Sequence, residues 1–158
     1  MKIVSCLVLL LAAGLSTGCR MVNQAQYQLA GSGRGQNLQT TVTAADRQAV
    51  KSVLASTAAT LKFQDMTELS LVPNVIGSWQ QQDSENPIKL VARAVNDRVV
   101  IDLLHYPQTV GETLGYRTAK ELLLENLRKK FGRKVVIIPK TEWIDPARDV
   151  PAAEGPVP

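Results

Sequence analysis

The chain has 158 residues, of which 45% are hydrophobic and 20% charged, and its formal net charge is +4. These values are typical of a single globular domain, and so small a positive charge does not favour nucleic acid as a partner. Both cysteines, Cys6 and Cys19, lie near the N-terminus. Their position excludes a disulfide, a thiol nucleophile and a cysteine-ligated metal from the rest of the chain.

Residues 1–18 have the pattern of a secretory signal peptide. Lys2 supplies a positive charge, an apolar stretch follows over residues 3–13, and small residues fill positions 14–18. About 20 apolar residues are needed to cross a bilayer, so this stretch is too short for a membrane span. The pattern therefore predicts export.

The segment that ends at Cys19 resembles the lipobox of bacterial lipoproteins, although Leu15 lies four residues before the cysteine where the usual box has Leu three before. The resemblance implies that Cys19 becomes the lipidated N-terminus, carrying palmitate and anchoring the protein in a membrane. Arg20 follows, rather than the Asp that resembles an inner-membrane retention signal. We therefore expect the periplasmic face of the outer membrane. The alternative is an ordinary signal peptide with an unmodified cysteine.

Two low-complexity segments flank the predicted domain. Residues 19–39 are rich in Gln, Asn, Gly and Ser, which predicts a lipidated N-terminus followed by a flexible tether. Residues 146–158 are rich in Pro and Ala, which predicts a disordered tail. A globular domain is expected over residues 40–145.

The domain opens with a predicted helix. Thr43 can cap its N-terminus and Asp46 suits its first turn. Apolar residues recur at helical spacing after them, namely Val50, Leu54, Thr57, Ala58 and Leu61. Pro73 interrupts the next apolar stretch, residues 69–82, which we interpret as an irregular edge strand.

A β-hairpin is predicted around Asn96 and Asp97, because both residues tolerate a tight turn. Pairing residues 88–95 with residues 98–106 places one apolar set toward the core, namely Ile88, Leu90, Ala92, Ala94, Val99, Ile101, Leu103 and His105. The opposite face carries Arg93 and Asp102, which lie within reach of a cross-strand ion pair. We expect that face to be exposed to solvent, so that Val100→Asp destabilises the domain less than Ile101→Asp.

A second helix is expected to begin at a capping box over residues 109–112 and to run to Phe131, with Gly132 ending it. The apolar residues 135–138 predict a strand buried on both faces. The predicted fold is α+β, with two helices packed on a small mixed sheet in two layers and the element order α-β-β-β-α-β.

Catalytic and cofactor signatures are missing from the sequence. His105 is the only histidine, and its place on the core-facing side of the hairpin indicates a structural role. No G-x-S-x-G motif accompanies it, and one histidine without a domain cysteine excludes the common zinc sites. We expect no enzyme activity, no metal and no cofactor.

The candidate binding residues are five cations near the end of the second helix, namely Arg128, Lys129, Lys130, Arg133 and Lys134. Cations favour a helix C-terminus by about 0.3–1 kcal/mol each, so the cluster is explained by helix stability alone. It is also explained by a patch for anionic lipid, glycan or an acidic partner.

One family resemblance covers about half of the chain that remains after the signal peptide. A strand ends near an Asn, an Ile-Asp pair follows, and a helix leads through a Gly-Arg turn to a strand, as in the LpoB-type lipoproteins that activate penicillin-binding proteins. The matching positions are Pro87, Ile88, Asn96, Ile101, Asp102, Gly132 and Arg133. The resemblance implies a small α/β domain that docks on another envelope protein, a cell-wall synthase, without catalysis. The alternatives are a structural lipoprotein that binds envelope polymer or anionic lipid and, less favoured, a hydrolase.

Labelling with palmitate tests the anchor. We expect the wild-type chain to incorporate label and to sediment with membranes, and Cys19→Ala to lose the label. A wild-type chain that takes up no label and stays in the soluble fraction contradicts the lipoprotein interpretation.

Overall fold

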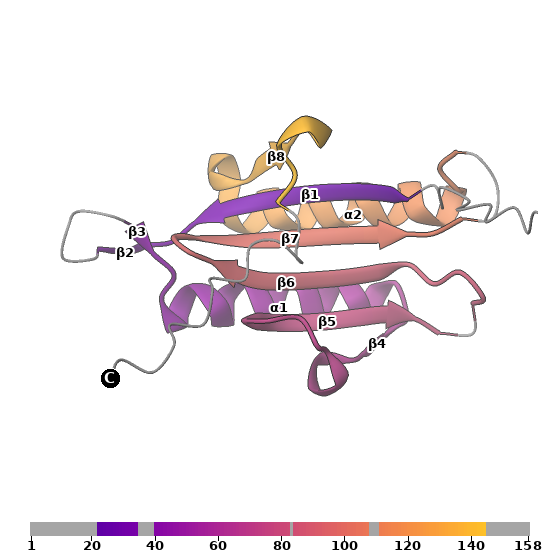
Figure 1. The fold of residues 1–158 in the computed structure, drawn as a ribbon, viewed down its shortest axis with the longest axis horizontal. Helices are drawn as coiled ribbons and strands as arrows, with labels where there is room; N and C mark the ends of the chain where they lie inside the picture. Colours follow the sequence, from indigo (N-terminus) through magenta and orange to yellow (C-terminus); the bar gives the residue numbers. More distant parts are fainter. Residues whose placement is uncertain (1–21, 35–39, 83, 108–110, 145–158) are drawn as a thin grey trace, which may run out of the picture.

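The computed structural model describes residues 22–34, 40–82, 84–107 and 111–144. In these residues the protein is α+β, with two helices and a six-stranded antiparallel sheet of order β4-β5-β6-β7-β1-β8. The sheet strands are β1 (Asn23–Ala30), β4 (Phe63–Asp65), β5 (Val75–Gln81), β6 (Lys89–Val95), β7 (Arg98–His105) and β8 (Val136–Ile138), and the helices are α1 (Ala44–Thr60) and α2 (Leu114–Phe131). Both helices lie behind the sheet in Figure 1.

Short elements connect these parts. A two-stranded ribbon, β2 (Gly33–Arg34) with β3 (Thr40–Thr41), lies between β1 and α1. Three short 3₁₀ turns complete the described chain, namely η1 (Thr67–Leu69), η2 (Gly132–Lys134) and η3 (Lys140–Glu142).

The predicted hairpin is confirmed. Strands β6 and β7 pair across Asn96, which adopts the left-handed backbone conformation with φ 51°. Ala92 lies opposite Ile101, and neither side chain is exposed. The side-chain alternation thus sets the register, as expected when one face must be buried.

Both predicted helices are present, and their apolar stripes face the sheet. Thr43 and Asp46 form a complete capping box at the start of α1. The buried helix residues are Val50, Leu54, Thr57 and Ala58 of α1 and Tyr116, Ala119, Leu123 and Leu127 of α2. Helix α2 begins later than expected, because Thr113 rather than Thr109 supplies the capping oxygen. Thr109 lies outside the described residues.

The largest correction concerns the predicted tether. Residues 23–30 form β1, which pairs with β7 along its whole length and with β8 on its other side. Its glutamines alternate with Ala25, Tyr27 and Leu29, and the last two are buried at 2% and 4% exposure. The element order therefore differs from the predicted α-β-β-β-α-β, and the sheet is antiparallel rather than mixed.

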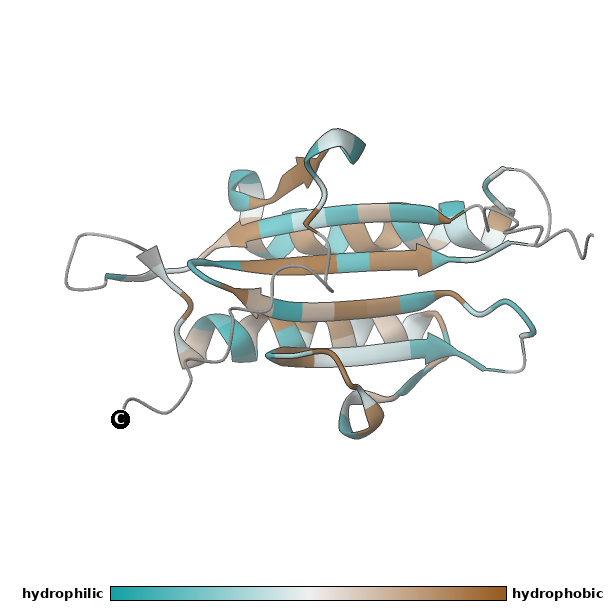
Figure 2. Cartoon of the chain, in the orientation of Figure 1, coloured by the Kyte–Doolittle hydropathy of each residue, from teal (hydrophilic) through white to brown (hydrophobic). Residues whose placement is uncertain are grey.

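Two further strand predictions are wrong. Strand β5 is not an edge strand, because it pairs with both β4 and β6. Strand β8, expected to be buried on both faces, lies at the edge of the sheet and leaves Val136 and Ile137 about half exposed. Figure 2 shows β8 as a brown, apolar strand at this margin.

The face of the sheet away from the helices is also partly buried, against expectation. The chain turns back after β8 in front of the sheet (Figure 1), which brings Ile144 over β1 and β6. The Ile144 N–H donates to Gln26 Oε1 at 3.0 Å, and the Ile144 carbonyl accepts from Arg93 Nη2 at 2.9 Å. Val100 beneath is fully buried, so Val100→Asp and Ile101→Asp should both be severe.

A buried polar network fills the centre of this second face. Arg93 Nε lies 3.5 Å from Asp102 Oδ2, and both side chains are 4% exposed. The amides of Gln26 and Gln24 donate to Asp102 Oδ1 at 2.8 and 3.1 Å. The predicted ion pair is therefore present, but in a buried setting where each partner needs the other.

Asp102→Ala should lower the free energy of unfolding by about 3 to 5 kcal/mol, because it leaves the Arg93 guanidinium buried without its counter-charge. Urea denaturation measures this loss. The double variant Arg93→Met/Asp102→Leu should recover part of it, since no unpaired charge then remains, although the Gln26 and Gln24 amides lose their acceptor.

Arg98→Ala provides the control, because it removes an exposed ion pair with Asp97 and one partly buried hydrogen bond to Gln28. It should lower the free energy of unfolding by less than about 2 kcal/mol. Equal losses for Asp102→Ala and Arg98→Ala would contradict the buried network.

Candidate functional site

His105 lies at the end of β7 and is 5% exposed. Its ring stacks on Tyr116 of α2 with 5.7 Å between centroids, and burial lowers its pKa. Its Nδ1 has no hydrogen-bond partner among the described residues. The ring is thus held neutral in the core, where the sequence predicted a structural histidine.

Tyr116, which stacks on this ring, is not activated. Burial raises its pKa well above the usual range, and its hydroxyl donates to the Leu103 carbonyl at 3.3 Å. Neither ring is arranged to take a proton from a substrate, because a general base needs a pKa near the working pH and access to the reacting group.

The five predicted binding residues gather at the C-terminal end of α2, and all are exposed. Arg128, Lys129 and Lys130 form the last turn of the helix. Gly132, with φ 60°, then reverses the chain and donates its N–H to the Arg128 carbonyl. Arg133 and Lys134 follow in η2. None of the five forms an ion pair within the described part of the chain.

Four of these cations line three hollows, and Arg133 lines none of the three. Lys129 and Lys130 line a groove of about 400 Å³ between the helices, facing Ser52 and Ser56 of α1. Arg128 borders an open depression that also contains Glu121 and Glu125. Lys134 reaches a third hollow at the end of the sheet. The cluster therefore forms one charged end of the molecule and borders several hollows.

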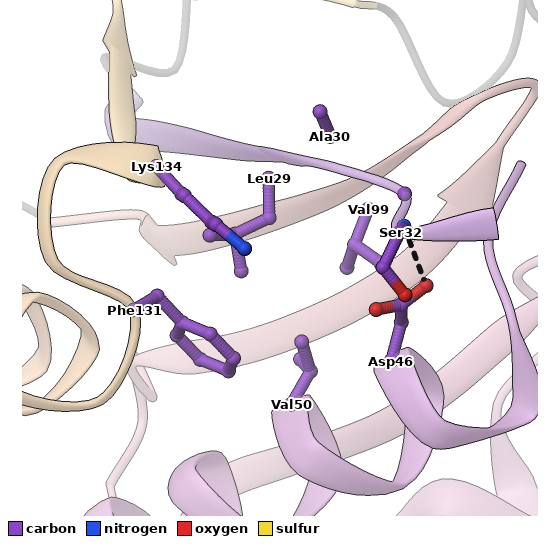
Figure 3. Close-up of a pocket in the computed structure, with 9 residues that line it drawn as sticks. Leu29, Ala30, Ser32, Asp46, Val50, Val99, Phe131 and Lys134 are labelled. Carbon is purple, nitrogen blue, oxygen red and sulfur yellow. Dashed lines mark hydrogen bonds between the residues drawn. The ribbon is translucent and has the colours of Figure 1, made fainter. Parts of the chain in front are cut away.

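The third hollow, which we call the sheet-end pocket, has a cavity of about 210 Å³ and is the most apolar of the three. Its lining residues are Leu29, Ala30, Gly31, Ser32, Asp46, Val50, Val99, Phe131 and Lys134. Figure 3 shows side chains from β1, from β7, from the start of α1 and from the end of α2 converging on it. Our sequence reasoning missed this pocket because it assigned residues 29–32 to a tether. The period-two alternation of residues 25–29 was the signal that could have placed them in a strand.

Asp46 lies at the rim of the sheet-end pocket and caps α1. Its Oδ2 accepts from the backbone N–H groups of Ser32 and Thr43 at 2.9 and 2.8 Å, and from the Thr43 hydroxyl at 2.8 Å. Partial burial acts to raise its pKa, but the hydrogen bonds from Ser32 and Thr43 outweigh it and lower the pKa to about 2. The rim therefore carries a fixed negative charge at neutral pH.

Three further predictions concern the lipidation site, a metal site and a membrane span. Cys19 lies outside the described residues. Within the described ranges, no group of three or more His, Cys, Asp or Glu residues is placed to hold a metal, and no helix there is long and apolar enough to cross a membrane.

Comparisons with protein-family models, with curated proteins and with solved structures find no match to this chain. The resemblance to LpoB-type lipoproteins consequently remains a prediction.

The buried His105 should make stability depend on pH. Since its pKa is lower in the folded than in the unfolded protein, the unfolded chain binds more protons below about pH 6.5, and stability falls as the pH drops through that value. The slope cannot exceed about 1.4 kcal/mol per pH unit for one proton. Denaturant unfolding between pH 7.5 and 5.5 measures it.

His105→Leu should flatten this part of the profile, because no group remains that titrates there. An unchanged slope in His105→Leu would show that His105 is not the group responsible.

Proposed function

We propose that this protein is a membrane-anchored envelope lipoprotein that acts as a non-catalytic binding or accessory module. Cys19 provides the anchor in this proposal, and the basic end of α2 provides the contact surface. The resemblance to LpoB-type lipoproteins makes a cell-wall synthase the expected kind of partner.

The exposed basic end of α2 is the observation that carries the proposal. Five cations project around one helix terminus and have no acidic partner among the described residues. Helix stability accounts for Arg128, Lys129 and Lys130 in the last turn of α2, whereas Arg133 and Lys134 lie beyond the helix. Such a concentration of unpaired charge favours association with an acidic surface.

The state of His105 supports a binding role over a hydrolase. A hydrolase needs its base exposed to substrate and hydrogen-bonded to a nucleophile, whereas His105 is buried against Tyr116. Binding to envelope polymer or anionic lipid stays the second candidate, because the groove between the helices presents Lys129, Lys130 and two serine hydroxyls. These donors suit phosphate or carboxylate groups.

Charge reversal tests the partner. A photo-crosslinking amino acid at exposed Glu125 should capture one envelope protein in cells. The triple change Arg128→Glu, Lys129→Glu and Lys130→Glu should reduce that crosslink by about tenfold or more, since like charges then face each other. Cosedimentation with peptidoglycan or anionic vesicles should change little.

A matched control reverses three exposed cations elsewhere, Lys51, Lys89 and Arg117. It changes the net charge equally and should keep the crosslink. If no protein is captured and polymer or vesicle binding collapses only in the first variant, the partner proposal is wrong and the polymer or lipid candidate replaces it.

A further inference from the structure

We propose that the sheet-end pocket binds a free amino acid with an apolar side chain. The pocket would hold the side chain between the ends of the two helices, Asp46 would accept from the ligand's ammonium group, and Lys134 would donate to its carboxylate. Arg128, Lys129 and Lys130, the residues that the charge reversal tests for docking, do not line the pocket, and only Lys134 belongs to both surfaces.

The interior of the pocket sets the size of the side chain. Leu29, Val50, Val99 and Phe131 supply an apolar wall. An engineered cavity of about 150 Å³ with a similar lining holds benzene. A cavity of about 210 Å³ therefore accommodates a branched aliphatic or benzyl group. Burying such a group favours binding by about 1.5–3 kcal/mol, which glycine cannot gain.

The rim of the pocket sets the head group. Lys134 extends its amine over the pocket in Figure 3, on the side opposite Asp46. Asp46 Oδ2 accepts from the Ser32 and Thr43 N–H groups and from the Thr43 hydroxyl, and the Ser32 side chain also hydrogen-bonds this carboxylate. The ligand's ammonium group would compete with the Ser32 side chain, because the carboxylate keeps its negative charge. Asp46 and Lys134 form no ion pair with each other, so two opposite charges flank one opening.

A ligand with a single charge fits this rim poorly. A simple carboxylate is attracted by Lys134 and repelled by Asp46, and a simple amine meets the reverse arrangement. A zwitterion places one group against each and gains from both. An α-amino acid is the smallest molecule that combines such a head group with an apolar side chain.

The experiment uses the full chain in a non-ionic detergent and calorimetric titration with leucine, tested as both enantiomers, and with three analogues. Leucinamide lacks the carboxylate, N-acetylleucine lacks the ammonium group, and glycine lacks the side chain. Leucine should bind in a saturable manner. Each head-group analogue should bind about two- to fivefold more weakly, as expected for a partly exposed ion pair, and glycine at least about tenfold more weakly.

Two variants assign these effects to residues. Lys134→Gln should weaken leucine to the level of leucinamide and leave leucinamide itself unchanged. Val50→Phe should fill the cavity and abolish leucine binding, with folding checked by its melting temperature. Lys130→Gln removes a neighbouring cation that does not line the pocket and should bind leucine normally.

The proposal is overturned if the folded wild-type chain binds neither enantiomer of leucine. It is equally overturned if Lys134→Gln weakens leucine and leucinamide to the same extent. Lys134 is an exposed residue, so this second comparison stands even if Val50→Phe fails to fold.

Discussion

The hydrogen bonds of one side-chain amide, that of Gln26, hold the second face of the sheet together. Its Nε2 donates to Asp102, which neutralises Arg93, and the same amide binds both the N–H and the carbonyl of Ile144. A buried charge pair needs hydrogen-bond partners for its remaining lone pairs and protons. The amides of Gln26 and Gln24 supply them to Asp102, whereas Arg93 Nε has none among the described residues. Gln26 therefore links β1, β7 and the segment after β8, and β8 itself pairs with no described strand except β1.

Because the segment through Ile144 covers the second face of the sheet, only part of the surface stays open to a partner. The helices cover one face of the sheet, and the turn through Ile144 covers the centre of the other (Figure 1). The described chain consequently presents its helix ends and the groove between the helices, where the cations lie. Binding on this surface needs no rearrangement of the core, because Lys129 and Lys130 are already exposed.

The sequence predicted the hairpin correctly, because a short turn and alternating side chains allow one pairing register. The Asn96 turn fixes the hairpin register, because a shift of one residue would move Ile101 into the polar network and Asp102 into the apolar core. Sequence reasoning failed for β1, because glutamines at every second position resemble a solvated segment. Only the distant Asp102 and Ile144 make Gln26 a core residue, at 0% exposure. The cations at the end of α2 were visible from composition, whereas the sheet-end pocket is assembled from β1, β7 and both helix ends.

The rim of the sheet-end pocket illustrates how simple helix rules can generate a site. An acidic residue belongs at a helix N-terminus and basic residues near a C-terminus, so Asp46 stabilises α1 and Lys134 follows α2. Because Asp46 and Phe131 line the same pocket, the start of one helix meets the end of the other, and the opposite charges face each other. The charge of Asp46 thus serves helix α1 as well as the pocket, whereas Lys134 lies in the turn beyond α2. A ligand that bridges them replaces water at both groups, so its affinity depends chiefly on the apolar side chain that it buries.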